Sequence, residues 1–570
     1  MKPEHRTIIA VALSAAFFIL WITVINPSKK PPQDATAPAA QTAPAANPQG
    51  AAAAPTVAGT QATNPPSAPV ASGPADPQAK LPVKTWTIKN DLVEAELTSD
   101  GAVLASYRVL KYRQTTDAGS PAIDLAASSV GLPPALSLLL EGANFAFPVR
   151  AHFELVSADE SKAVFEWRSP EVVVVKTISI PKDSYVADVS VEVKNRTSRA
   201  LSARALLAWS GMTPPPKKGG FFSFLKQPSS DTKDPVYYIN GSVKRETNPA
   251  KIGARSEQSG SVLWSGVESR YFLSAVIPRV QGEGLSVEYG SAELSAEPAG
   301  TRGVWAGAAL PQFTAVPGEA AVQRFSVYAG PKEINQLKAV GVKLDEAIDY
   351  GWFTVIAVPI LYLLKFFYGA IRNYGVAIIL LTIFVKLLLH PVNIKSLKSM
   401  KEMQRLQPKL KELQQKHKGD KQRINQETMQ LFRAHKVNPM GGCLPMLLQF
   451  PIYIALYKVL WNSIELYHAP FFGFYRDLSA PDPYLITPIL LGIFMVAQQK
   501  LMPSASADPA QQKMMMFMPI MFAGFMLFLP VGLVVYILIN TAMSVTQQWM
   551  YNKGIRYRDL IRGKWLPRSA

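Results

Sequence analysis

One basic side chain, Lys386, stands inside an apolar run that is long enough to cross a bilayer. The run covers residues 375–389, and Thr382 is its other polar side chain. A charge at such a depth costs about 2.5–3.5 kcal/mol on insertion scales, so it usually faces water or protein rather than lipid. A lone lysine near the end of its run can also extend its amine to the headgroups. The residue type predicts electrostatic attraction of an acidic group inside the membrane.

Further polar side chains lie from the middle to the inner ends of other apolar runs. Gln449 lies in one of them, and Asn540 and Ser544 lie in the last one. Polar groups without water or partners in hydrocarbon are costly. We therefore expect these three side chains to share one hydrated recess with Thr382 and Lys386. Such amides also serve as contacts between helices, and that alternative stays open.

Signatures of catalysis and of metal binding are missing from the sequence. The six histidines show no metal-ligand spacing, and the lone Cys443 has no evident partner base. The net charge of +18 would suit nucleic acid. However, the basic residues cluster beside apolar runs, as in a membrane protein. We expect no catalytic residue, no metal, no cofactor and no DNA partner.

Upstream of the membrane runs, the chain divides by composition into three parts. Residues 1–26 carry basic side chains and then an apolar run without a small-residue cleavage pattern, which predicts an uncleaved transmembrane anchor. Residues 27–80 hold 12 Pro and 17 Ala and no aromatic residue, which predicts an extended tether. Residues 81–335 contain short alternating segments such as 172–180, which predict a large extracytoplasmic antiparallel β-sandwich.

Charges beside the later apolar runs predict the topology. The segment 393–438 holds 12 Lys and Arg against four acids, and the tail 551–570 holds six against one. Basic segments stay on the cytoplasmic side of the membrane. Both of these segments face the cytoplasm if the run 351–368 lies along the membrane interface and does not cross it. We therefore expect a linker and interfacial helix at 336–373 and a five-span core at 374–550. The basic segment within that core is expected to form a cytoplasmic helical hairpin. The chain would be a multi-span α-helical membrane protein with six transmembrane helices and both termini cytoplasmic.

Four motifs give the chain a close resemblance to a known family. They are N-P-M-G-G-C-L-P-M-L-L-Q-F-P-I at 438–452, D-L-S-A-P-D-P-Y at 477–484, D-P-A-Q-Q-K-M-M-M-F-M-P at 508–519 and L-V-V-Y at 533–536. In these motifs and in the order of its parts, the chain resembles the YidC-type membrane protein insertases of Gram-negative bacteria, which have mitochondrial and chloroplast relatives. The resemblance implies a supersandwich for the β domain, a place in the inner membrane, and a β domain in the periplasm.

The resemblance also implies a physical mechanism of insertion. The family's groove opens to the cytoplasm and carries a positive residue, usually arginine, where this chain has Lys386. A client's polar segment would enter the groove while its apolar segment moves into lipid along an apolar slide. The implied slide consists of Met446, Leu447, Phe450, Met514, Phe517, Met518 and Met521. The implied partners are nascent membrane proteins, membrane lipids, a translocation channel and, through the basic hairpin and tail, the ribosome.

Two other functions stay open at this point. A secondary transporter or channel would also bury a charge, although such proteins usually show internal repeats and broken helices. No useful repeat is visible in the sequence. A membrane-anchored carbohydrate-binding protein would carry its activity in the β domain instead.

Overall fold

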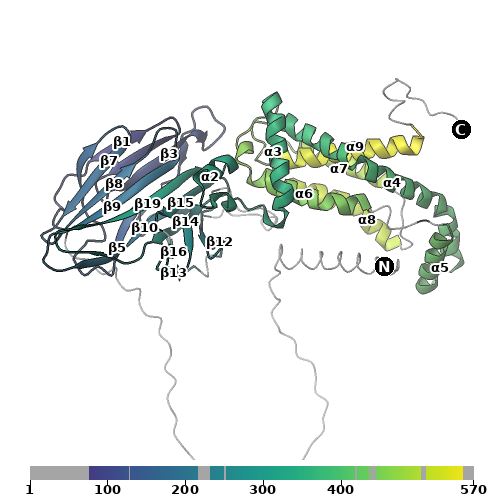
Figure 1. The fold of residues 1–570 in the computed structure, drawn as a ribbon. Helices are drawn as coiled ribbons and strands as arrows, with labels where there is room; N and C mark the ends of the chain where they lie inside the picture. The colour runs from purple at the N-terminus through teal and green to yellow at the C-terminus, as the bar shows by residue number, and fades with distance from the viewer. Residues whose placement is uncertain are drawn as a thin grey trace, which may run out of the picture. The chain divides into compact units, whose positions relative to one another are not determined.

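The computed structural model describes residues 76–126, 129–215, 231–248, 252–280, 282–417, 420–435, 437, 444–501 and 509–555, with the backbone alone at 421, 425, 444–448 and 509–516. These residues form a strand-rich part followed by a helical part (Figure 1). The expected anchor, nearly all of the tether and most of the basic tail lie outside the described residues.

The largest sheet of the strand-rich part has nine antiparallel strands. Their order is β12-β11-β14-β15-β19-β9-β8-β7-β6. The strands are β6 (Glu154–Ala158), β7 (Lys162–Arg168), β8 (Val172–Ser179), β9 (Val186–Asn195), β11 (Asp234–Ile239), β12 (Ser242–Arg245), β14 (Val262–Glu268), β15 (Phe272–Pro278) and β19 (Ala320–Pro331). In β7 buried and less buried residues alternate, as expected for a strand with one face on a core.

Two smaller antiparallel sheets complete the strand-rich part among the described residues. One follows the order β13-β16-β17-β10-β18, with β5 also paired to β10, and the other follows β1-β2-β3-β4. Their strands are β1 (Thr85–Lys89), β2 (Val93–Thr98), β3 (Val103–Arg113), β4 (Ala122–Asp124), β5 (Ser137–Glu141), β10 (Leu201–Thr213), β13 (Ser256–Ser259), β16 (Ser286–Glu293), β17 (Arg302–Ala309) and β18 (Phe313–Ala315). The antiparallel β domain predicted from the alternating segments is confirmed.

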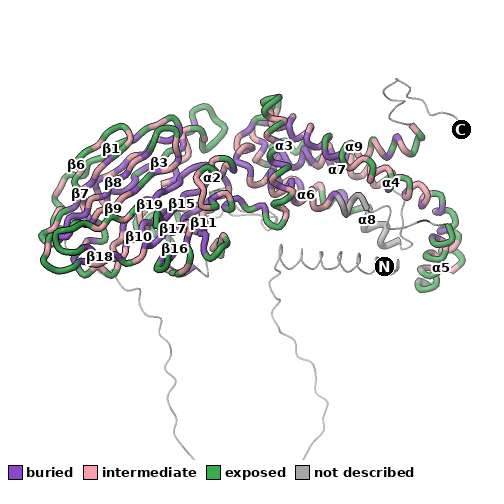
Figure 2. Tube along the Cα trace, in the orientation of Figure 1, coloured by how far each residue is buried: buried purple, intermediate pink, exposed green. Residues whose placement is uncertain are grey.

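Large aromatic side chains from different sheets fill the core of the β domain. Trp167 on β7, Trp209 on β10 and Trp264 on β14 are all fully buried. Tyr107 on β3 packs edge-to-face against Trp209, with ring centroids 5.9 Å apart. Figure 2 shows this burial as purple segments along the strands. The sheets are therefore held together by a shared apolar core, which suits a domain without disulfides.

A lysine lies inside that core without an acidic partner among the described residues. Lys176 on β8 is in phase with the buried Val174 and Ile178, so its side chain points inward. Its Nζ donates to the backbone oxygens of Ala102, at 2.7 Å, and Leu136, at 2.5 Å. Both acceptors have positive φ, 49° and 66°. Lys176 thus forms hydrogen bonds to two turns, at Ala102 and at Leu136, whose left-handed backbone conformation L-residues rarely adopt.

The helical part contains the segments expected to meet the membrane. Its helices are α2 (Ile334–Val340), α3 (Thr354–Ile371), α4 (Tyr374–Lys416), α5 (Lys421–Ala434), α6 (Leu444–Asn462), α7 (Ile486–Leu501), α8 (Pro509–Met526) and α9 (Val531–Lys553). The helix α4 continues without a break from the predicted span into the basic segment, and α5 begins at Lys421. Figure 2 shows the end of α4 and α5 as mostly exposed or half-buried.

The expected number of six spans is not confirmed by helix length and composition. Among the described residues three helices are long and apolar enough to cross a bilayer: Gly351–Ile371, Tyr374–Lys416 and Val531–Lys553. The helix α7, with 16 residues, reaches about 24 Å, less than a hydrocarbon core of about 30 Å. The first of the three long helices is also the one that the charge pattern placed in the interface.

The loop between α6 and α7 is organised by one buried carboxylate. Asp482 Oδ2 accepts from the Thr487 backbone N at 2.7 Å, the Thr487 hydroxyl at 2.8 Å and the Tyr475 hydroxyl at 3.0 Å. Its Oδ1 accepts from Tyr484 N at 2.9 Å. Burial acts to raise the pKa of Asp482, but the hydrogen bonds from Thr487, Tyr484 and Tyr475 outweigh it and lower that pKa. The ionised form therefore fixes the start of α7.

Replacing Asp482 by alanine should destabilise the protein by about 1–3 kcal/mol, because several donors lose one shared acceptor. Since the native pKa of Asp482 is lowered, its contribution is present above the ordinary carboxyl pKa and is lost as the pH falls below that value. Thermal unfolding of the full-length protein in detergent measures the loss. Asp91→Ala, at an exposed position, is the matched control, and equal unfolding temperatures for both variants would contradict the prediction.

Candidate functional site

Three helices bring the polar residues of the apolar runs together. Lys386 and Thr382 lie on α4, Gln449 on α6, and Asn540 and Ser544 on α9. Spacings of four residues place Thr382 with Lys386, and Asn540 with Ser544, on one face of their helices. Because α9 packs against both α4 and α6, the structure brings the three helices that carry these residues together.

Lys386 is the charged group of this cluster. Its side chain is 3% exposed, and its Nζ donates to Ser544 Oγ at 2.7 Å. Ser544 Oγ in turn donates to the backbone oxygen of Asn540 at 2.9 Å. No carboxylate forms an ion pair with Lys386 among the described residues. A lysine ammonium has three donors, so this buried cation has donors to spare.

An amide pair links α6 to α9 beside the lysine. Gln449 Nε2 donates to Asn540 Oδ1 at 2.6 Å, and Asn540 Nδ2 donates to the Tyr453 hydroxyl. The Tyr453 ring packs edge-to-face on Tyr536, with centroids 5.6 Å apart. The sequence analysis missed Tyr453, because a tyrosine in an apolar run is ordinary. Its place four residues after Gln449, on the same helix face, is the signal that would have found it.

The cluster is closed in this conformation. Thr382, Gln449 and Asn540 are buried and Ser544 is half-buried. Thr382 donates to the backbone oxygen of Ile378 in its own helix, at 2.7 Å. The amide and hydroxyl groups therefore bond to each other or to their own helix, and the predicted recess is not open to solvent here. An isolated cation in such surroundings is costly unless a partner or water reaches it.

The predicted apolar slide is exposed where its side chains are described. Phe517, Met518 and Met521 on α8 are exposed, and Ile520, which the sequence analysis did not include, is exposed beside them. Phe450 on α6 is half-buried. The side chains of Met446, Leu447 and Met514 lie outside the described residues. The exposed face of α8 is apolar, and two of its side chains, Met518 and Met521, are flexible.

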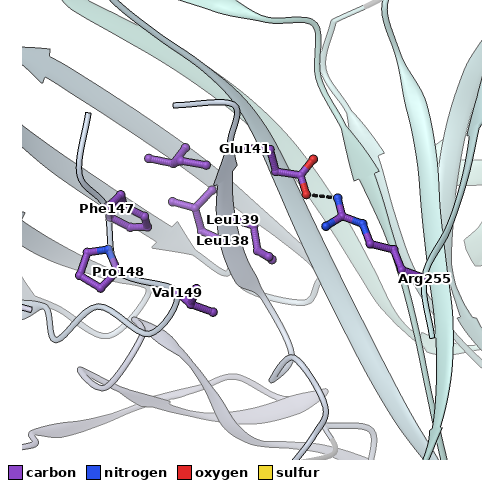
Figure 3. Close-up of a pocket in the computed structure, with 8 residues that line it drawn as sticks. Leu138, Leu139, Glu141, Phe147, Pro148, Val149 and Arg255 are labelled. Atoms are coloured by element: carbon purple, nitrogen blue, oxygen red, sulfur yellow. Dashed lines mark hydrogen bonds and ion pairs between the residues drawn. The ribbon is translucent and has the colours of Figure 1, made fainter. Parts of the chain in front are cut away.

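The β domain contains a separate cavity of about 390 Å³ beside β5 (Figure 3). Its wall is apolar, formed by Leu138, Leu139, Phe147, Pro148 and Val149, and its rim carries an ion pair between Glu141 and Arg255. Arg255 also pairs with the buried Glu288, at 2.5 Å. Because these charges are engaged with each other, the rim is largely neutralised. No group of three metal-ligating side chains lies together within the described ranges.

Two family models match the chain, one over each part. The model described as "YidC periplasmic domain" matches residues 85–363, which hold the three sheets. The model described as "60Kd inner membrane protein" matches residues 366–558, which hold the Lys386 cluster and α8. Together the two models cover nearly all of the described structure.

Curated relatives align over almost the whole chain. The membrane protein insertase YidC of Syntrophus aciditrophicus is 37% identical, over 96% of this chain and 99% of the relative. The YidC of Anaeromyxobacter dehalogenans strain 2CP-C is 39% identical, over 97% and 98%. A crystal structure of an active YidC insertase covers 82% of this chain and 94% of its own, with 17% identity and a TM-score of 0.36.

Proposed function

Because this chain belongs to the YidC family of membrane protein insertases, and is an inner membrane protein with a periplasmic domain, we propose that it inserts its clients through the Lys386 cluster. Its substrates are nascent membrane proteins. The transporter and the carbohydrate-binding protein that the sequence left open are set aside, because relatives over the full length are named insertases. The residues that carry insertion, and the path that clients take, are the substance of the proposal.

The observation that carries the proposal is a buried cation whose one hydrogen-bond partner among the described residues is neutral. Lys386 donates to Ser544, and its spare donors and its charge favour an acidic client segment. A polar client segment that enters between α4, α6 and α9 would exchange its hydration for the amide and hydroxyl groups of Gln449, Asn540 and Ser544. Thr382 would line the same groove one turn from Lys386. The charges of the client then cross only part of the hydrocarbon.

The apolar segment of the client would leave the groove along α8. Phe517, Met518 and Met521 offer it an exposed surface that adapts to varied side chains. We include Phe450 in this slide, together with Met446, Leu447 and Met514 from the sequence. Partition of an apolar segment into lipid needs no input of chemical energy, because burial from water is itself favourable. The mechanism is therefore physical and uses no covalent step.

Thiol labelling tests whether the groove is wet on one side. A cysteine at Ser544 should react with a water-soluble thiol reagent from the cytoplasmic side at least about tenfold faster than one at Phe525, because thiols in apolar surroundings stay protonated and unreactive. Cys443 is first replaced by serine. The labelling rate of each full-length variant in inverted vesicles is the measurement. Equal rates at both positions from both sides would indicate a continuous aqueous pore and contradict a one-sided groove.

For the topology, we propose six spans with α3 in the interface on the periplasmic side. Figure 1 shows α3 running across the direction of α4, α6 and α9. Its Lys365 is paired with Glu333 and Glu465, and Pro359 lies inside the helix. We propose further that the basic hairpin and tail contact the ribosome through release of RNA counterions. A translocation channel would cooperate for larger clients.

This topology predicts where the tip of the hairpin can be labelled. A cysteine replacing the exposed Lys416, in a Cys443→Ser background, should react with a membrane-impermeant reagent in inverted vesicles and not in intact spheroplasts. The physical reason is that basic segments resist translocation. A cysteine replacing the exposed Glu283 in the β domain is the control and should show the opposite pattern. Labelling at position 416 from outside spheroplasts would overturn the arrangement.

A further inference from the structure

A second cavity, of about 430 Å³, lies where the end of the β domain meets α3, α4 and the loop after α6. No step of the insertion mechanism uses it. Its charged groups are Glu333, which precedes α2, Lys365 on α3, and Glu465 on the short 3₁₀ helix Ile464–Leu466. The cavity is therefore assembled from segments far apart in the sequence.

The charges of this cavity do not cancel. Lys365 Nζ lies 3.1 Å from Glu333 Oε1 and 2.7 Å from Glu465 Oε1. Two carboxylates against one ammonium leave a formal charge of −1. Glu465 Oε2 accepts from the Ser463 hydroxyl at 2.8 Å, whereas the buried Oε1 accepts no well-directed hydrogen bond from any described residue. The cavity therefore has acceptor capacity for one more cation, and an anion would meet a lysine that is already engaged twice.

The walls of the cavity are aromatic. They consist of Tyr112, Tyr368, Tyr374 and Tyr467. The rings of Tyr368 and Tyr374 stack with centroids 3.8 Å apart, and the ring of Tyr467 lies 6.4 Å from that of Tyr112. Aromatic faces attract ammonium groups, and a cage of such rings is a common way to bind them. Rings and carboxylates together select a small amine.

The surroundings of the cavity favour a lipid as the source of that amine. Phe366, next to Lys365 on α3, is exposed, and so are Ile371 at the end of that helix and Trp352 before it. Exposed aromatic and apolar side chains beside a helix of this kind are typical of the zone where headgroups meet acyl chains. A lipid headgroup in this zone would reach the cavity, and the acyl chains of the lipid would stay beside α3.

We propose that this cavity binds the primary ammonium of an ethanolamine phospholipid of the outer leaflet, with Glu465 and Glu333 as its acceptors and the four tyrosines as its walls. The lipid would join the β domain to α3 and the loop after α6. This inference goes beyond insertion and does not depend on Lys386.

Lipid binding to the full-length protein in detergent tests the proposal. Short-chain phosphatidylethanolamine, phosphatidylcholine and phosphatidylglycerol are titrated separately, and bound lipid is counted by native mass spectrometry. The ethanolamine lipid should bind about tenfold more tightly than the glycerol lipid, the difference expected for one charge-assisted contact. Glu465→Gln should remove that preference, whereas Glu283→Gln at an exposed site should keep it. Tyr374→Phe should retain binding and Tyr374→Leu should weaken it.

Three results would overturn the proposal. The first is equal affinity of the wild-type protein for the ethanolamine and glycerol lipids, a result that needs no variant to fold. The second is an unchanged preference in both Glu465→Gln and Glu333→Gln when their unfolding temperatures match the wild type. The third concerns the source of the amine. Binding of free phosphoethanolamine as tight as that of the lipid would indicate a soluble ligand, and equally tight binding of a lysine peptide would indicate a protein partner.

Discussion

Replacing Lys386 by glutamate should abolish insertion of clients whose polar segment is acidic. An attraction of about 1.5–3 kcal/mol becomes a repulsion of similar size, so the insertion rate should fall by at least about 100-fold. Lys386→Arg should keep most of the activity because it keeps the charge, and Lys386→Ala should lose about tenfold. Purified protein in liposomes, scored by protease protection of the tail of a single-span client, gives these rates.

The comparison between clients separates attraction from simple misfolding. A client with a neutral tail should be affected much less by Lys386→Glu than a client with an acidic tail, whereas a misfolded protein would fail with both. Lys244→Glu makes the same change of charge at an exposed position of the β domain and should insert both clients at the wild-type rate. If Lys386→Ala also inserts both clients at the wild-type rate, the charge of Lys386 has no role in insertion and its side chain only extends to the headgroups.

The membrane cluster was predictable because polar residues are rare in apolar runs. Lys386, Gln449, Asn540 and Ser544 each stand out against their neighbours, and the cost of isolating them in hydrocarbon is a physical reason for them to meet. The contacts themselves were not predictable. Which pairs form depends on how α9 rotates against α4 and α6, and nothing local in the sequence fixes that rotation. The contact of Tyr453 with Asn540 was not predictable for the same reason, because it also depends on the rotation of α9.

The β domain shows the same limit. Alternation within 172–180 predicted a strand, and its phase already placed Lys176 on the inward face with Val174 and Ile178. The order of strands was not predictable, because β8 pairs with its neighbours in the chain while β19 pairs with β15 and also with β9, which lies more than a hundred residues before it. The acceptors of Lys176, Ala102 and Leu136, depend on that long-range order. The contacts of Lys365 with Glu333 and Glu465 likewise depend on how segments distant in the sequence come together.

Lys176 should make the stability of the β domain rise with pH. Burial lowers the pKa of Lys176 from 10.5 to about 7. Between those values the unfolded chain binds one proton more than the native protein, so the free energy of unfolding increases as the pH rises. A shift of this size corresponds to about 5 kcal/mol across the window. Both carbonyl contacts survive deprotonation, because a neutral amine still has two donors for the oxygens of Ala102 and Leu136.

Lys176→Met removes the titration but not the apolar part of the side chain. Urea unfolding of the full-length protein in detergent, followed by fluorescence of the buried Trp167, Trp209 and Trp264, gives the free energy at each pH. Between pH 7 and pH 10.5 the free energy of unfolding of the wild type should increase relative to that of Lys176→Met. Parallel curves would mean that the native amine titrates as it does in the unfolded chain, and that water reaches it inside the core.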